Sequence, residues 1–179
     1  GVNPWDRDLP GKALGGDLDY LQRTIPHFHA EGARFMTAES SDNWGPNGLG
    51  YYLASRMLWD VDEATQINQL TNDFLDKAFG TAKTPMADFY KLLDGSKKVP
   101  LSDDLIGRLF RALSTARGQT QDEKVLARLD DLALYARYVE IYNEYSVATA
   151  PARQPAFEQL LRFAYRIRNT GMIHTMALY

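Results

Sequence analysis

The residues with the clearest chemical potential gather in one short polar stretch. It contains Glu39, Asp42, Asn43 and Trp44. A carboxylate can act as an acid, a base or an anchor for a substrate hydroxyl. An indole on a polar loop is a common platform for stacking a sugar ring. We therefore take Glu39 as the catalytic candidate. Asp42, Asn43 and Trp44 are the candidates for substrate binding.

Each of these residues also has a plain structural explanation. Glu39 would serve equally well as a solvated carboxylate or as a partner for Arg34. Asp42 and Asn43 are common turn formers, because their side chains bond to their own backbone. Trp44 would be structural if it filled the underside of a helix bundle. The sequence leaves these alternatives open.

Other residues add little chemistry. Trp5, in the first loop, is expected to border the same pocket as Glu39, on its residue type alone. His27 and His29 are two residues apart, so on a helix they point to different sides, and no third ligand lies at helical spacing. Residues 45–48 lack the lysine and the spacing of a phosphate-binding loop and predict a turn. We therefore expect no metal site and no cofactor.

These candidates must be positioned by the elements around them. Pro26 lacks the amide proton that a helix interior needs, so it predicts a break between two short helices. The apolar residues before Glu39 predict a strand, and a helix is expected after the polar stretch. The elements predicted before residue 60 are a loop over 1–16, helices over 18–23 and 26–31, a strand over 33–38, a loop over 39–48 and a helix over 49–59.

After residue 60 the pattern is helical throughout. Apolar residues recur at spacings of three and four, which is typical of helices that bury one side. The predicted helices cover residues 63–79, 85–94, 103–117, 121–149 and 156–169. Asp17, Ser102 and Thr120 are the predicted N-caps of the helices that follow them, and Gly80 is expected to end the helix before it. The predicted fold class is therefore mainly α, a helical bundle of about five helices preceded by a terminal βα unit of an incomplete (β/α)8-type barrel.

Composition excludes several classes of function. The 179 residues carry 20 basic and 23 acidic side chains, a net charge of −3, without a long block of one sign. No nucleic-acid partner and no membrane partner is expected. The chain has no cysteine, which excludes disulfides and cysteine ligands to metals. No apolar run approaches the roughly 20 residues that span a bilayer.

Three blocks of residues carry a resemblance to a known family. They are Ala38-Glu39-Ser40-Ser41-Asp42-Asn43-Trp44-Gly45-Pro46-Asn47-Gly48-Leu49 with Tyr51-Tyr52-Leu53-Ala54 and Leu58-Trp59-Asp60, then residues 74–80 and 86–94, and finally residues 166–174. With these blocks in this order, the chain resembles a bacterial family of uncharacterised, glycoside-hydrolase-like proteins. In layout that family is similar to α-glucuronidases and β-hexosaminidases, in which a (β/α)8 barrel precedes helices.

The resemblance implies two parts, the end of a catalytic barrel in residues 1–60 and a helical domain in residues 61–179. Glu39 would then lie at the sugar-facing end of a late strand. A full barrel takes about 250 residues, so at most one or two strands fit here. The implied partners are a carbohydrate and the remainder of a longer parent chain. The resemblance also implies export of that parent, although the residues themselves leave the compartment open.

Two classes of function follow. Glycoside hydrolysis normally uses two carboxylates, and only Glu39 with Asp42 or Asp6 is available here. We therefore expect a C-terminal segment of a glycoside hydrolase that acts on poly- or oligosaccharides and is inactive when isolated. The alternative is a non-catalytic module for helical interaction, homo-oligomerisation or carbohydrate binding.

Overall fold

A computed structural model describes residues 15–37, 42–97 and 99–175. The described residues form helices and no strand, so the chain is mainly α. The α-helices are α1 (Leu18–Ala30), α2 (Trp44–Trp59), α3 (Ile67–Phe79), α4 (Lys83–Leu93), α5 (Asp103–Gly118), α6 (Glu123–Val147) and α7 (Arg153–Ile167). Short 3-10 helices cover Val61–Gln66, Gly80–Ala82, Gly95–Lys97 and Arg168–Thr170. The five α-helices after residue 60 confirm the predicted bundle.

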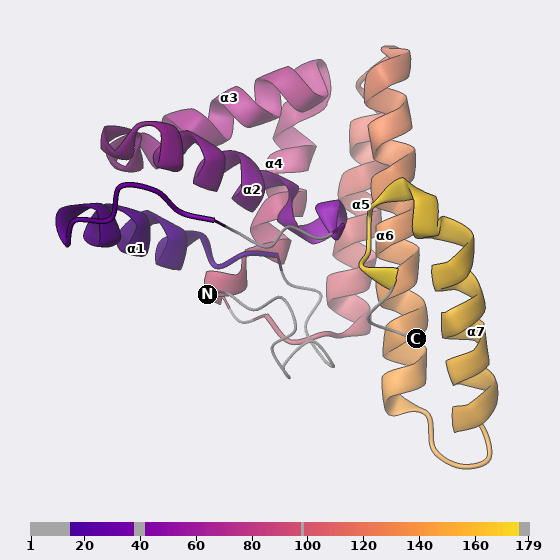
Figure 1. The fold of residues 1–179 in the computed structure, drawn as a ribbon. Coiled ribbons are helices and arrows are strands. Elements are labelled where there is room, and N and C mark those ends of the chain that lie inside the picture. The colour runs from indigo at the N-terminus through magenta and orange to yellow at the C-terminus, as the bar shows by residue number, and fades with distance from the viewer. Residues whose placement is uncertain (1–14, 38–41, 98, 176–179) are drawn as a thin grey trace.

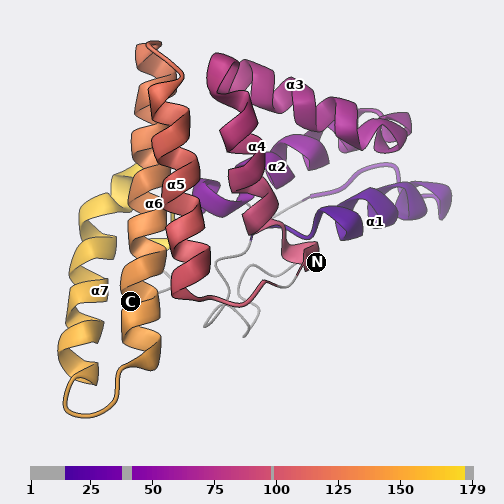
Figure 2. The ribbon, with the colours of Figure 1, turned by 180° about the vertical axis from the view of Figure 1, so that it is seen from behind.

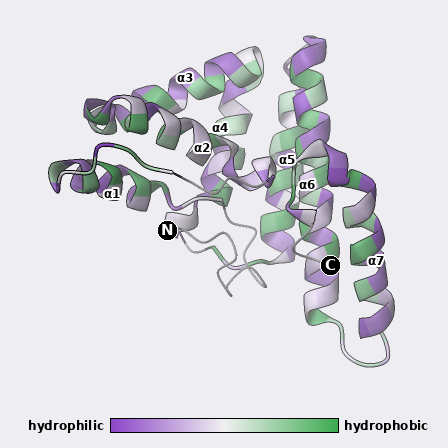
Figure 3. Ribbon diagram, in the orientation of Figure 1, coloured by the Kyte–Doolittle hydropathy of each residue, from purple (hydrophilic) through white to green (hydrophobic). Residues whose placement is uncertain are grey.

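The helices form two groups (Figure 1). Helices α1, α2 and α3 lie side by side, and α5, α6 and α7 stand as a second array at a steep angle to them. Helix α4 lies at the junction and packs most extensively against α5, as the view from behind also shows (Figure 2). The helices carry both hydrophobic and hydrophilic residues along their length (Figure 3).

One continuous core joins the two groups. Leu53 of α2, Phe89 of α4 and Leu109 of α5 are fully buried. Tyr90 is the centre of an aromatic cluster, with its ring 5.3 Å from that of Phe74 and close to those of Phe79 and Phe89. This core contains residues from both sides of position 60, and the division into two domains there stays a prediction.

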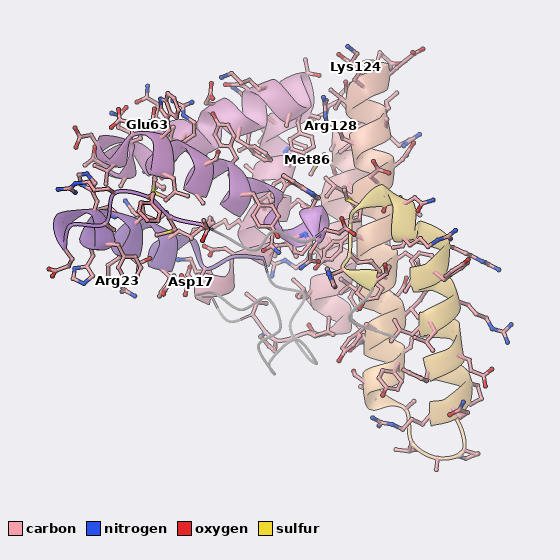
Figure 4. All side chains as sticks on the ribbon, in the orientation of Figure 1. Asp17, Arg23, Glu63, Met86, Lys124 and Arg128 are labelled. Atoms are coloured by element: carbon pink, nitrogen blue, oxygen red, sulfur yellow. The ribbon has the colours of Figure 1, made fainter. Side chains whose placement is uncertain are left out.

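Several helix ends follow the predicted capping chemistry. The Asp17 carboxylate accepts a hydrogen bond from the backbone N–H of Tyr20 at 2.8 Å, which begins α1 (Figure 4). The Ser102 hydroxyl accepts from Leu105 N–H at 3.2 Å in the same way at α5. Gly80 follows α3 with a positive φ of 52°. Helix α6 begins two residues later than predicted, because Asp122 rather than Thr120 is its N-cap.

Pro26 does not break the first helix, and that prediction is wrong. Helix α1 runs through it from Leu18 to Ala30. Tertiary contacts replace the lost backbone bond: Ile25 is buried, and the Gln22 side chain donates to the carbonyl of Ala64 at 2.8 Å. Packing of this kind supplies most helix stability in proteins, so one missing hydrogen bond is tolerated.

The strand predicted over residues 33–38 is not formed in its described part. Residues 33–37 have no regular secondary structure and are exposed. A strand needs a neighbour for its N–H and C=O groups. Here the hydrogen bonds between described residues are local instead: Ala33 N–H donates to the Phe28 carbonyl at 3.0 Å, and the Arg34 guanidinium donates to the His29 carbonyl.

Candidate functional site

Three of the predicted site residues lie at the start of α2 or just before it. The helix begins at Trp44, five residues before the predicted start, so residues 45–48 are helical and the predicted turn is wrong. Asn43 is the residue before the helix and has a positive φ of 77°. Asp42 is exposed and Asn43 is half-buried. Glu39 and Trp5 lie outside the described residues.

The start of α2 is held by the C-terminal part of the chain rather than by a side-chain cap. Trp44 N–H donates to the carbonyl of Gly171 at 2.8 Å, and Gly45 N–H donates to the carbonyl of Met172 at 3.2 Å. Pro46 has no N–H, and Asn47 N–H begins the helical pattern by bonding to Asn43. Positions 44–46, whose N–H groups usually lack a partner at the start of a helix, are therefore accounted for. This leaves the first turn no free backbone donor for a phosphate.

Close packing explains why glycine follows Trp44. A Cβ placed on Gly45 would lie 2.6 Å from Cγ of Tyr135 on α6 and 2.8 Å from the Met172 carbonyl oxygen. Tyr135 is fully buried, and that burial raises the pKa of its hydroxyl. The absent side chain lets the start of α2 lie close to both Tyr135 on α6 and the backbone of Met172.

The indole of Trp44 is half exposed, with 51% of its surface accessible. The Tyr51 ring lies 4.9 Å from it, centre to centre, and the two planes meet at 77°, an edge-on contact. The Tyr51 hydroxyl also reaches the Asp42 carbonyl at 3.4 Å. Trp44 therefore does not plug the underside of the bundle, and we name this pair of rings the aromatic platform.

Tyr51 was missed as a site residue, although its position gave a signal. It follows Trp44 by seven residues, which is two helical turns, so both side chains lie on the same side of α2 once the helix begins at Trp44. A helix beginning at residue 49 hides that relation, because Trp44 then belongs to a loop.

A second polar cluster links α2 to α3 and was also missed. Arg56 donates to both carboxylate oxygens of Glu63, with Nε at 2.9 Å, and to the Tyr52 hydroxyl at 3.1 Å. Tyr52 donates to Asp73, which also accepts from Lys77 at 2.8 Å. The spacing of Tyr52 and Arg56, one helical turn apart, was the available signal.

The charges in this cluster stabilise one another. The hydrogen bond from Lys77, and next that from Tyr52, lowers the pKa of Asp73. The bond to Glu63 raises the pKa of Arg56, and burial followed by the bond to Asp73 raises the pKa of Tyr52. Asp73 stays ionised at neutral pH, so it is a poor general acid. The cluster is better suited to joining helices than to proton transfer.

The histidine pair and the tyrosines of α6 have no site geometry. His27 and His29 are exposed on α1, and the described residues contain no group of three potential metal ligands among His, Asp and Glu. Burial raises the pKa of Tyr138 to about 12, so its hydroxyl stays protonated at neutral pH. These α6 tyrosines are part of the packing between helices.

Three open grooves lie away from the aromatic platform. One of about 380 Å³ is at the turn between α6 and α7, where the Arg153 guanidinium lies 4.9 Å from the centre of the Tyr145 ring. A second of about 580 Å³ lies between α4 and α5, and a third of about 620 Å³ lies between α6 and α7. None of the three has a pair of facing carboxylates of the kind that glycoside hydrolysis uses.

No family model, curated protein sequence or solved structure matches this chain. Within the described residues, no helix combines the length and the apolar character needed to cross a bilayer. The resemblance to glycoside-hydrolase-like proteins therefore stays a prediction, and the aromatic platform is the feature from which a function can be argued.

Proposed function

We propose that this chain is the C-terminal segment of a glycoside-hydrolase-like protein and that the aromatic platform contacts the sugar. The observation that carries the proposal is the half-exposed Trp44 indole beside the Tyr51 ring. Exposing an indole is unfavourable in water, and a rigid aromatic surface next to polar groups is a surface on which a sugar ring can stack. Asp42 and Asn43, which precede Trp44, supply polar groups that can bind the hydroxyls of the sugar.

The proposal includes a barrel end in residues 1–60, with Glu39 as one catalytic carboxylate. The second carboxylate, which retaining and inverting mechanisms both need, would come from the rest of the parent chain. The isolated segment then binds sugar weakly and does not hydrolyse it.

The test uses tryptophan fluorescence. The chain has three tryptophans, so the variant Trp5→Phe/Trp59→Phe leaves Trp44 as the only reporter, and Trp5→Phe/Trp44→Phe leaves Trp59. Trp59 is a matched control, because it lies at the other end of α2 and is 91% exposed. Soluble oligosaccharides from plant and algal polysaccharides should change the emission of Trp44 in a saturable way and leave that of Trp59 unchanged.

Two results would count against the proposal. An equal response from both reporters, or none from Trp44 across the panel, would remove the aromatic platform as a sugar site. Release of product from aryl glycosides by the 179-residue chain alone would show that the segment is catalytic by itself, against the second half of the proposal.

A non-catalytic interaction module is the second candidate. Phe35 and Trp59 are 90% and 91% exposed, which is unusual for large apolar side chains. Contact with another protein chain would remove such side chains from water. Sedimentation of the wild-type chain and of Trp59→Ser would distinguish the candidates, since a self-association interface would be weakened by the substitution.

A further inference from the structure

The groove between α4 and α5 combines an aliphatic floor with a basic rim. Its floor includes Leu92 and Ala112, which are nearly buried, and the partly buried Val99. Its cations are Lys91, Lys97, Arg108 and Arg111. Asp88 is the single carboxylate among the lining residues, so the groove is strongly positive although the chain as a whole carries a net charge of −3.

The cations of the rim are poorly neutralised. Lys91 and Arg111 make no ion pair with any described residue within 4 Å. Arg108 approaches Asp104 only to 3.8 Å, and Lys97 approaches Asp19 and Asp94 to 3.8 and 4.0 Å. Like charges gathered on one surface repel one another, and an anionic ligand would relieve that repulsion.

The shape of the groove limits what fits. It runs along α4 from Pro85 to Leu92 and along α5 from Arg108 to Thr115, a rise of seven residues in each case. At 1.5 Å per residue this is about 10 Å, or two helical turns. Its lining residues include no aromatic side chain, unlike the aromatic platform at Trp44. An acidic sugar would form ion pairs with the cations but would make no apolar contacts with the aliphatic floor.

We infer that this groove binds an acidic amphipathic helix from a partner protein, with aliphatic side chains on the floor and carboxylates against the rim. Helices that dock in grooves place apolar anchors at spacings of three, four and seven residues. About two turns of such a helix fit between α4 and α5. The basic rim would then set both the choice of partner and the rate of association.

The probe is a fluorescently labelled helical peptide of about 14 residues, roughly four turns, with leucine on one side and glutamate on the flanks. Its anisotropy is measured against the full chain at low and high salt. A peptide of the same spacing with lysine in place of glutamate, and an oligogalacturonate of similar charge, are run in parallel. The glutamate peptide should bind, more weakly as salt rises, and the other two should not.

Charge-reversal variants locate the site. Lys91→Glu/Arg111→Glu should weaken binding on the order of tenfold, because two attractions become repulsions. Arg23→Glu/Lys124→Glu changes the net charge equally on α1 and α6, outside the groove, and should leave affinity within about twofold of wild type (Figure 4). Lys91→Gln/Arg111→Gln replaces the reversal if circular dichroism shows that the reversed variant is unfolded.

Three outcomes would overturn the inference. The wild-type chain could fail to bind the glutamate peptide. Both reversal variants could lose the same affinity, which would show non-specific attraction. The oligogalacturonate could bind at the rim in place of the peptide, which would make the ligand an acidic saccharide. Because the groove shares no residue with the aromatic platform, none of these results bears on sugar binding at Trp44.

Discussion

Replacing Gly45 with alanine tests whether the start of α2 is packed against α6 as described. The added methyl group would lie 2.6 Å from Cγ of Tyr135 and 2.8 Å from the Met172 carbonyl oxygen. Neither contact is the flexible end of a side chain, since one is a buried ring and the other is backbone. Overpacking of this kind costs about 1–3 kcal/mol, and alanine recovers up to about 1 kcal/mol through its better helix propensity.

We expect Gly45→Ala to be destabilised by about 1–2 kcal/mol. For a chain of this size each kcal/mol lowers Tm by about 2–4 °C, so the decrease should be about 2–8 °C. Thermal unfolding followed by circular dichroism, together with urea denaturation, measures it. The emission of Trp44 in the single-reporter background should change too, because the bond from Trp44 N–H to Gly171 depends on the same close approach.

Gly107→Ala on α5 is the matched control. There the nearest atom to an added Cβ is the Arg111 guanidinium at 3.3 Å, which can move aside. The exchange should stabilise the chain by about 0.5–1 kcal/mol through helix propensity alone. If both substitutions raised Tm by the same amount, the described contact between α2 and α6 would be wrong.

Two further predictions concern the core and the charged cluster. Leu53→Ala should lower the free energy of unfolding by about 2–5 kcal/mol, measured by urea denaturation, because Leu53 is fully buried and its truncation leaves a cavity. A decrease below about 1 kcal/mol would mean that the site collapses or is solvated. Asp73→Asn should lower Tm at neutral pH, and the difference from wild type should shrink as the pH falls from about 5 to about 3. The sign follows from the lowered pKa of Asp73 in the folded chain. The ionised carboxylate stabilises the fold at pH values above the ordinary pKa of 3.8, and this stabilisation is lost as the pH falls through the lower pKa of the folded state. A difference in Tm that does not depend on pH would contradict the prediction.

Local chemistry was enough to predict much of the fold. The N-caps at Asp17 and Ser102 and the glycine after α3 are properties of single turns, and the structure confirms them. The apolar spacing along residues 61–179 likewise predicted five helices. These features depend on residues close in sequence, so periodicity and capping rules can detect them.

The errors arise where distant residues decide the local structure. Gly45 and Pro46 oppose helix interiors, yet in the first turn a missing N–H costs little and the missing side chain makes room for Tyr135, 90 positions away. Pro26 is tolerated because α1 is packed against α2 and the segment after it. Rules based on neighbouring residues do not include these long-range contacts. The same contacts also affect the candidate site, because Trp44 and Tyr51 lie on the same side of α2 only when the helix begins at Trp44.

In the proposed function, residues at the start of α2 bind the sugar and other residues hydrolyse it. Trp44 is held by Gly171 through its backbone N–H and by Tyr51 through its ring, and the next residue, Gly45, is held by Met172; all three partners lie downstream in the chain. In the proposed function these contacts orient the indole, whereas Glu39 serves the chemical step. Glu39→Gln should therefore leave any sugar response of Trp44 unchanged even where a full enzyme would lose its turnover. A platform built in this way would orient a sugar, and the bond-breaking groups would have to be brought to it from elsewhere.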